Sequence, residues 1–140
     1  MSKTISIERH LKYPIQKVWE ALTTPAILAK WFMESNFKPQ IGAEFYFHGI
    51  ARDGWDGIIQ CKVTEIIPPY KLAYTWQGNH LDSVTYVQWE LIEAGSGTLL
   101  KLQHSGFSET SVSPIDWFEE HVKGWTRILG QLQDFLTTKA

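Results

Sequence analysis

The C-terminal segment, residues 114–138, constrains the fold of this chain more than any other stretch. Its apolar residues recur at alternating steps of three and four positions, which places them on one stripe of an α-helix. Ser113 as N-cap and Pro114 at the first helical position define the start, and acidic residues follow where the helix dipole favours negative charge. The spacing predicts a long helix with a stripe made of Ile115, Phe118, Val122, Trp125, Leu129, Leu132 and Leu136.

The apolar face of this helix is wider than a seam between two helices. Trp117, His121 and Ile128 flank the stripe. An apolar face of that width needs a broad partner, such as a β-sheet, to cover it. The rest of the chain must therefore supply a sheet.

Alternating apolar and polar residues predict that sheet in the preceding part of the chain. Turn signals such as Asp53-Gly54, Gly78-Asn79 and Gly95-Ser96-Gly97 separate the alternating runs. Pro14 and Pro25 instead open two short helical patterns directly after the first run. The predicted strands cover residues 4–11, 44–48, 58–67, 71–77, 83–93 and 98–105.

This order of elements predicts the α+β class. We expect an antiparallel sheet that curves around the long C-terminal helix, with the two short helices closing one end of the roll. A length of 140 residues and a hydrophobic content of 44% suffice for one sizeable core. Residues 1–140 are therefore expected to form a single domain.

Charge and cysteine content exclude several classes of partner. The formal net charge is −2 and the basic residues are scattered, so neither nucleic acid nor an anionic membrane is an expected partner. The single cysteine, Cys61, excludes an internal disulfide. No signal-peptide pattern opens the chain and no apolar run is long enough to span a bilayer, so we expect a cytoplasmic protein without a membrane span.

Short motifs along nearly the whole chain follow one another as they do in a known protein family. They are Tyr13-Pro14 through Val18-Trp19, Ala21-Leu22-Thr23-Thr24-Pro25, Trp31-Phe32, Gly42 to Phe47, Pro68-Pro69 with Leu72, Tyr74, Thr75 and Trp76, Gly97-Thr98 with Leu100, Leu102 and His104, and Gly124-Trp125 with Leu129 and Leu132. Together they resemble the family of activator of Hsp90 ATPase homologue-like proteins, which belongs to the START-like (SRPBCC) superfamily.

The resemblance implies the helix-grip START-like fold, in which an antiparallel sheet wraps a long last helix and a cavity can open between them. It also implies relatives that are mostly small bacterial proteins, some of which bind hydrophobic or aromatic molecules, and a eukaryotic branch that stimulates the chaperone's ATPase. The eukaryotic activator has an additional N-terminal domain important for that role, whereas this chain begins directly at the START-like strand. A chaperone interaction is therefore the weaker of the expectations that the resemblance raises.

The alternation of the strands predicts which side chains point toward the N-terminal half of the long helix. The residues expected to contact a ligand there are Phe32, Phe45, Phe47, Trp76, Trp89, His104, Trp117, His121 and Trp125. A mostly apolar pocket with a few polar groups is the usual make-up of a small-molecule site. The alternative is that the same aromatic residues simply fill a core.

His104 and His121 are each open to two interpretations. In the functional one, the imidazole contacts a ligand or accepts a proton inside the cavity. In the structural one, it is a buried neutral ring that needs only a hydrogen-bond partner. Trp31 and Phe32, at the end of the short helices, are likewise either a gate to the cavity or a lid packed on the core.

Metal and covalent chemistry find little support in the sequence, and no cofactor is expected. The five histidines are far apart, with no pair at ligand spacing and no second cysteine to help. Cys61 lies in a β-branched run without a basic neighbour, which is typical of an inert buried thiol. We therefore predict neither a metal site nor a nucleophile.

Three functions stay open on the sequence alone. The first is binding of a small hydrophobic or aromatic molecule between the sheet and the helix. The second is an enzyme of cyclase, hydrolase or isomerase type on the same scaffold, with His104 or His121 as general base beside Tyr74 or Tyr86. The third is a protein-interaction module, either chaperone-related or a homodimer that uses exposed aromatic residues such as Tyr46 or Tyr86.

Overall fold

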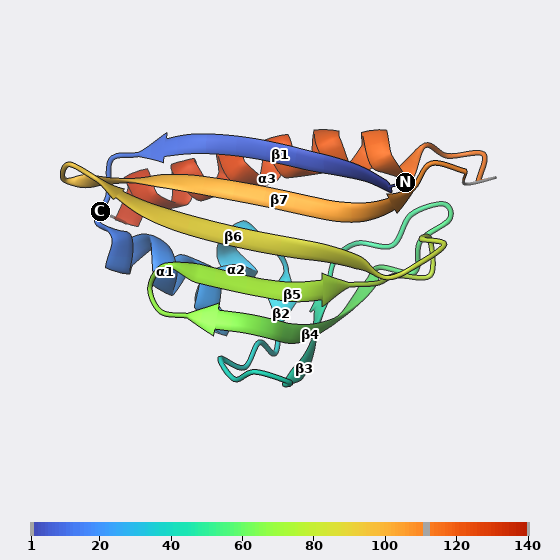
Figure 1. Ribbon diagram of the computed structural model, residues 1–140, viewed down its shortest axis with the longest axis horizontal. Helices are drawn as coiled ribbons and strands as arrows, with labels where there is room; N and C mark the ends of the chain where they lie inside the picture. The colour runs from blue at the N-terminus through green and yellow to red at the C-terminus, as the bar shows by residue number, and fades with distance from the viewer. Residues whose placement is uncertain (1, 111–112, 140) are drawn as a thin grey trace.

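A computed structural model of the chain describes residues 2–110 and 113–139. One strand leads into two short helices, six further strands follow, and a long helix ends the chain (Figure 1). The elements are β1 (Ser2–Leu11), α1 (Ile15–Thr23), α2 (Pro25–Trp31), β2 (Glu34–Ser35), β3 (Glu44–His48), β4 (Ile58–Ile67), β5 (Lys71–Trp76), β6 (Thr85–Ala94), β7 (Gly97–Ser108) and α3 (Trp117–Lys139).

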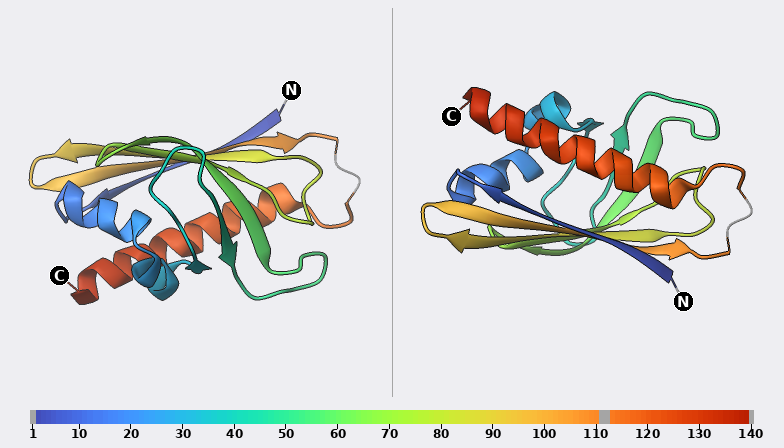
Figure 2. Two further views of the ribbon diagram at one scale, coloured as in Figure 1. Left: turned by 90° about the horizontal axis from the view of Figure 1, so that it is seen from below. Right: turned by 90° about the horizontal axis from the view of Figure 1, so that it is seen from above.

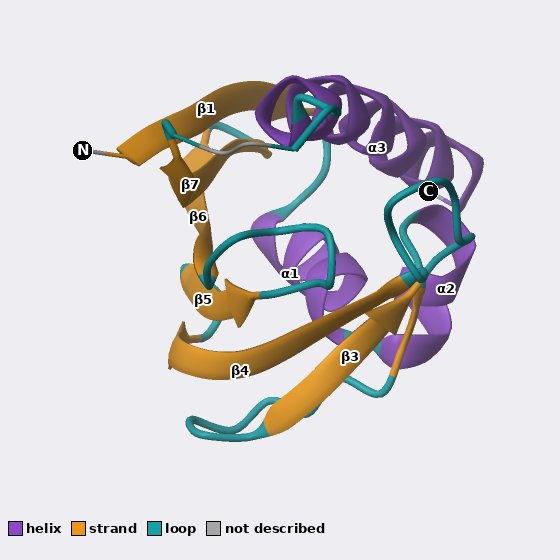
Figure 3. Ribbon diagram, turned by 90° about the vertical axis from the view of Figure 1, so that its right-hand side faces the viewer, coloured by secondary structure: helices purple, strands orange, loops and turns teal. Residues whose placement is uncertain are grey.

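The strands form one seven-stranded sheet in the order β1-β7-β6-β5-β4-β3-β2, and every neighbouring pair is antiparallel. The meander from β3 to β7 follows the chain, whereas β1 pairs with the last strand, so that Ile7 lies opposite Leu102. Viewed from one end, the sheet curls from β1 round to β3, and α3 and α2 lie on the open side of the curl (Figure 3). The structure confirms the α+β helix-grip fold class.

The concave face of the sheet carries the core because side chains alternate between the two faces of a strand. On β4, for example, Ile59, Cys61 and Val63 are buried while their neighbours face solvent. The long helix covers this face (Figure 2). Its buried side chains are Trp117, Trp125, Leu129, Leu132 and Leu136, the last four of which belong to the predicted stripe.

The two short helices close one end of the roll near the C-terminal half of α3 (Figure 2). Two hydrogen bonds hold them there. The indole Nε1–H of Trp31 donates to the carbonyl oxygen of Ala21 at 2.9 Å, which joins α2 to α1. The amide Nε2 of Gln131 donates to the carbonyl oxygen of Trp31 at 2.6 Å, which joins α3 to α2. Trp31 is therefore a packed lid and not a gate.

The start of the long helix differs from the prediction. Helix α3 begins at Trp117, and the carboxylate of Asp116 caps it by accepting a hydrogen bond from the backbone N–H of Glu119 at 3.1 Å. Ser113 instead accepts from the backbone N–H of Ile115 at 3.2 Å, within a turn. A charged carboxylate is favoured at the positive end of the helix dipole, so the cap at Asp116 replaces the predicted one at Ser113.

A second difference is the two-residue strand β2, which the sequence does not predict. Glu34 and Ser35 pair with His48 and Phe47 at the edge of the sheet. Two residues are too short to display the period-two alternation on which strand prediction depends.

No helix in the described ranges 2–110 and 113–139 is long and apolar enough to cross a membrane.

Candidate functional site

A cavity of about 580 Å³ lies between the concave face of the sheet and the N-terminal half of α3. Strands β4 and β5 form its floor, the end of α2 forms one wall, and residues 48–55, at the end of β3 and in the loop that follows it, border its mouth. Its aromatic lining consists of Phe32, Trp55, Trp76, Trp117 and Trp125. Its polar lining consists of His48, Arg52, His80, Glu120, His121 and Arg127.

The nine predicted site residues divide into two groups. Phe32, Trp76, Trp117, His121 and Trp125 line the cavity. Phe45, Phe47, Trp89 and His104 are buried in the core and are not part of the lining. The second group supports the first, since the ring of Phe47 lies 4.6 Å from that of Phe32 and 5.6 Å from that of Trp76, measured between centroids.

The aromatic walls of the cavity pack against one another. The ring of Phe32 is nearly parallel to that of Trp76, with centroids 6.2 Å apart and planes 13° apart. Trp125 lies 5.5 Å from Phe32 and 5.2 Å from Trp76. Rings held by such contacts form a rigid apolar surface rather than a set of mobile side chains.

His104 is fully satisfied by hydrogen bonds inside the core. The indole Nε1–H of Trp125 donates to its Nδ1 at 2.9 Å, so the neutral ring carries its proton on Nε2. That Nε2 lies 2.7 Å from the hydroxyl of Thr85, which in turn donates to the carbonyl oxygen of Trp76 at 2.7 Å. Burial lowers the pKa of His104 well below its ordinary value, and neighbouring histidines lower it further. The ring is neutral and has no free lone pair.

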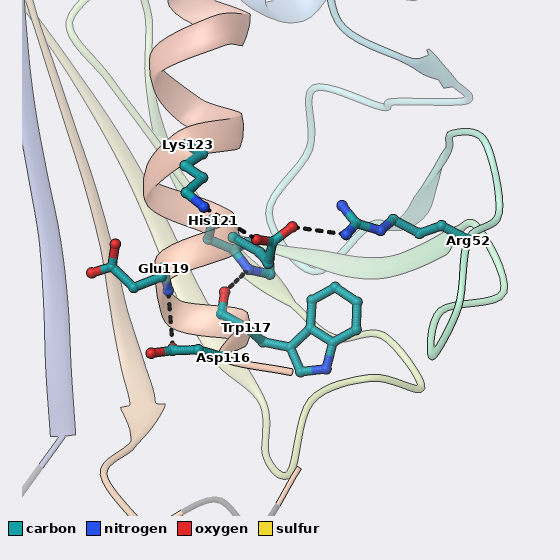
Figure 4. Close-up of polar contacts among 7 residues, drawn as sticks. Arg52, Asp116, Trp117, Glu119, His121 and Lys123 are labelled. Carbon is teal, nitrogen blue, oxygen red and sulfur yellow. Dashed lines mark hydrogen bonds and ion pairs between the residues drawn. The ribbon is translucent and has the colours of Figure 1, made fainter. Parts of the chain in front are cut away.

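His121 is also held in one tautomer (Figure 4). Its Nδ1 lies 2.7 Å from the carbonyl oxygen of Trp117, which has no proton to give, so Nδ1–H is the donor. The remaining lone pair, on Nε2, accepts a 3.3 Å hydrogen bond from the indole of Trp76. Burial lowers the pKa of His121, although the bond to Trp117 and the charge of Glu120 oppose the shift.

His80 belongs to the site, although the sequence does not predict it there. Its ring stacks on that of His121 with centroids 5.5 Å apart and planes 10° apart, and it meets the edge of Trp117 at 4.6 Å. Its Nδ1 is buried without a hydrogen-bond partner among the residues described. Burial and then His121 lower its pKa to about 4, against a smaller opposing effect of Asp56. In the sequence this histidine only follows a turn signal, and non-local contacts bring it to the cavity.

Three histidines thus lie together although they are far apart in the sequence. His121 is in ring contact with both His80 and His104, at 5.5 Å and 5.3 Å between centroids. Within residues 2–110 and 113–139, no group of three or more His, Cys, Asp or Glu side chains could hold a metal ion. The lone pairs of His104 and His121 face indole N–H groups and do not converge on one point.

The other candidate reactive groups lie away from the cavity. Cys61 is buried on β4, and burial raises the pKa of its thiol. Tyr74 is buried as well and its hydroxyl accepts the indole N–H of Trp89 at 2.9 Å, while desolvation raises its pKa. Tyr86 is 52% exposed and is not part of the lining. Neither tyrosine therefore stands beside a cavity histidine as a proton donor.

Charged side chains gather at the mouth of the cavity (Figure 4). Arg52 pairs with Glu120 at 2.8 Å, and its guanidinium lies 5.6 Å from the ring centroid of Trp117. Lys123 approaches the other oxygen of Glu120 at 3.7 Å. Arg127 donates to the side-chain oxygen of Gln131 at 3.0 Å. The loop that carries Arg52 is thereby tied to the first turns of α3.

A curved antiparallel sheet, a long last helix and an aromatic cavity between them define a START-like domain of the helix-grip type. The family model described as "Activator of Hsp90 ATPase homolog 1-like protein" matches residues 12–137. The chain belongs to this family. A comparison with curated protein sequences finds no match.

Solved structures share the fold over nearly the whole chain. Protein MLL2253 from Mesorhizobium loti is 29% identical, with a TM-score of 0.86 and 99% of each chain covered. Protein BH1534 from Bacillus halodurans is 31% identical, with a TM-score of 0.78 and 94% of this chain and 95% of that chain covered. The Aha1 dimer from Colwellia psychrerythraea is 25% identical, with a TM-score of 0.75 and 94% of each chain covered.

Proposed function

We propose that this protein binds a small hydrophobic or aromatic molecule in the cavity between the sheet and α3. The observation that carries the proposal is a space of about 580 Å³ walled by five aromatic residues. Small-molecule sites typically span about 300–1,000 Å³ and combine apolar walls with a few polar groups. A core that merely fills the roll would leave no such space.

The geometry favours binding over general-base catalysis by His104 or His121. A general base needs a lone pair within reach of a substrate proton. The lone pair of His104 accepts the indole N–H of Trp125, and that of His121 accepts the indole N–H of Trp76. An enzyme that uses either histidine as its base therefore ranks second to a binding protein.

Self-association is a separate proposal, supported by a neighbour rather than by the cavity. The structure from Colwellia psychrerythraea is that of an Aha1 dimer. A homodimer of this chain would appear as a concentration-dependent mass in analytical ultracentrifugation, and a constant monomer mass would overturn it. The family name makes stimulation of Hsp90 ATPase an assay to run beside it.

Gly124 provides a direct test of the cavity proposal. It lines the cavity, and a Cβ at this position would meet nothing within 4 Å, so a larger side chain has room there. Gly124→Leu should therefore fold normally and occupy part of the ligand space. Gly130→Leu is the matched control, because Gly130 also has nothing within 4 Å but lies outside the cavity lining.

The measurement is native mass spectrometry of protein purified without organic solvent, followed by titration with the neutral fluorophore N-phenyl-1-naphthylamine. We expect the wild type and Gly130→Leu to carry a co-purified compound or to bind the fluorophore. Gly124→Leu should carry less of the compound and bind the fluorophore more weakly, while keeping the same circular dichroism. Equal binding by both variants, or no binding by the wild type, would overturn the proposal.

A further inference from the structure

The mouth of the cavity is positively charged although the chain as a whole is slightly acidic. The formal net charge of the protein is −2. Glu120 is the one acidic residue among the described residues that line the cavity, and it already pairs with Arg52 and Lys123. Arg127 lines the cavity as well. Two arginines and one glutamate therefore line the cavity, which leaves an excess of positive charge among its lining residues.

Arg52 retains hydrogen-bonding capacity that the protein does not use. A guanidinium has five N–H donors in a planar fork, and the pair with Glu120 engages Nη2. The side chain is 54% exposed, so the remaining donors are accessible from the cavity mouth. The ring of Trp117 lies against the guanidinium at 5.6 Å from its centroid and holds it in place by a cation–π contact.

Arg127 adds positive potential without a carboxylate of its own. Its Nη1 donates to the neutral amide of Gln131 at 3.0 Å, and none of the described carboxylates lies within ion-pair distance of it. Asp56 belongs to the same loop as Arg52, but its Oδ1 accepts the backbone N–H of Ile58 at 3.1 Å, and it does not line the cavity.

The interior of the cavity is different from its mouth, because it offers no charge. Phe32, Trp76 and Trp125 are apolar, and burial keeps His80 and His121 neutral by lowering their pKa values. An ionised group on a ligand would lose its hydration in that interior without gaining a counter-ion. The same group at the mouth would meet Arg52 while still in contact with water.

We propose that the ligand is an aromatic acid, whose ring system enters the cavity while its carboxylate or sulfonate stays at the mouth and pairs with Arg52. Arg127 contributes to the potential that attracts the anion. This inference rests on the proposed function and adds the chemical class of the ligand. A neutral aromatic molecule of the same shape would bind more weakly, since it gains nothing from the guanidinium.

Two fluorescent probes with one skeleton test the inference. 8-Anilinonaphthalene-1-sulfonate and N-phenyl-1-naphthylamine share the phenylnaphthylamine rings, and only the first carries an anionic group. We expect the wild type to bind the sulfonate about fivefold to tenfold more tightly at low salt, as one charge-assisted contact provides. The preference should shrink in concentrated NaCl because salt screens the partly exposed pair.

Variants then assign the preference to Arg52. Arg52→Gln should remove the preference, by lowering affinity for the sulfonate to about that for the neutral probe. Lys62→Gln is the control for net charge, because Lys62 is an exposed residue of β4 that does not line the cavity. Gly124→Leu should weaken binding of both probes, which locates them in the cavity. Unchanged thermal unfolding of each variant excludes probe binding to partly unfolded protein.

The outcomes separate the two proposals. Binding of both probes without preference for the sulfonate, or an equal loss of both in Arg52→Gln, overturns the inference and leaves the proposed function standing. Sulfonate binding that persists in Gly124→Leu overturns the inference too, since the probe then sits elsewhere. Binding of neither probe by the wild type counts against the proposed function and removes the inference with it.

Discussion

The indole Nε1–H of Trp125 donates a 2.9 Å hydrogen bond to Nδ1 of His104 and so ties the long helix to strand β7 across the core. Both residues are buried, Trp125 at 2% and His104 at 0% exposure. The bond fixes the tautomer of the imidazole, and its other nitrogen is then taken by Thr85. His104 thus connects the helix to the sheet, and the cavity forms beside it without using its lone pair.

Removal of the indole N–H should therefore be costly. Trp125→Phe keeps an aromatic ring but leaves Nδ1 of His104 buried without a donor, and it reduces the packed volume. We expect the free energy of unfolding to fall by about 2–4 kcal/mol. Urea denaturation followed by circular dichroism measures this loss.

The matched control is Trp55→Phe. The indole of Trp55 donates to the carbonyl oxygen of Ile58 at 3.1 Å in an exposed position, where water can replace it. The same substitution should cost less than about 1 kcal/mol there. Equal losses of unfolding free energy in the two variants would show that the buried bond to His104 contributes no more to stability than the exposed bond of Trp55.

Stability should fall as the pH drops below the ordinary histidine range. The pKa of His80 in the folded protein is about 4, whereas an unperturbed histidine has a value of 6.5. Between these values the unfolded chain binds a proton that the folded protein does not. Stability is therefore full above about pH 6.5 and declines toward about pH 4, with a slope near 1.4 kcal/mol per pH unit for this histidine.

Substitution of the histidine isolates its share of this pH dependence. Denaturation curves of His80→Phe across that pH range should show a shallower decline than those of the wild type. His10→Phe is the control, because His10 is exposed on β1. A decline in His80→Phe as steep as in the wild type would show that His80 does not resist protonation in the folded state.

Much of the fold follows from local signals, whereas the cavity depends on non-local ones. The stripe of α3 and the alternation of β4 appear in the sequence because burial repeats with the period of the element. Five of the nine predicted site residues line the cavity for the same reason. The sequence does not predict His80 and Arg52 as site residues, because each is next to a turn signal: His80 follows Gly78-Asn79 and Arg52 precedes Asp53-Gly54. The sequence of a turn does not show which distant surface the turn contacts. Only the curl of the sheet brings them beside His121 and Glu120.

The thiol of Cys61 should be unreactive in the folded protein. It is 4% exposed, and burial raises its pKa, so the reactive thiolate is scarce as well as shielded. Labelling with 5,5′-dithiobis(2-nitrobenzoic acid) at mildly alkaline pH should follow the rate of unfolding. In concentrated guanidinium chloride it should be complete within the mixing time.

A thiol moved to the surface provides the comparison. Ser6 is an exposed residue of β1, so the double variant Cys61→Ser, Ser6→Cys should label at once without denaturant. Rapid labelling of the wild type under native conditions would contradict the inert buried role of Cys61 and reopen the question of a nucleophile on β4.

Two glycines should respond in opposite ways to the same substitution. A Cβ on Gly97, at the start of β7, would collide with the carbonyl oxygen of Leu11 at the end of β1. Because that neighbour is backbone, it cannot move aside, and Gly97→Ala should lower the free energy of unfolding by about 1–3 kcal/mol.

A Cβ on Gly130 meets nothing within 4 Å in an exposed part of α3. Gly130→Ala should raise stability by about 0.5–1 kcal/mol, because alanine favours the helix over glycine.

Thermal denaturation of the two variants side by side measures both effects. Loss of stability in Gly97→Ala should come with disruption where β1 meets the turn between β6 and β7, visible as faster amide hydrogen exchange at Lys12 and Thr98. If Gly97→Ala left the free energy of unfolding unchanged, the end of β1 would have to move away from β7 without loss of stability. Such a movement would break the pairing of Leu11 with Thr98, so this result would contradict the close approach of Leu11 to Gly97.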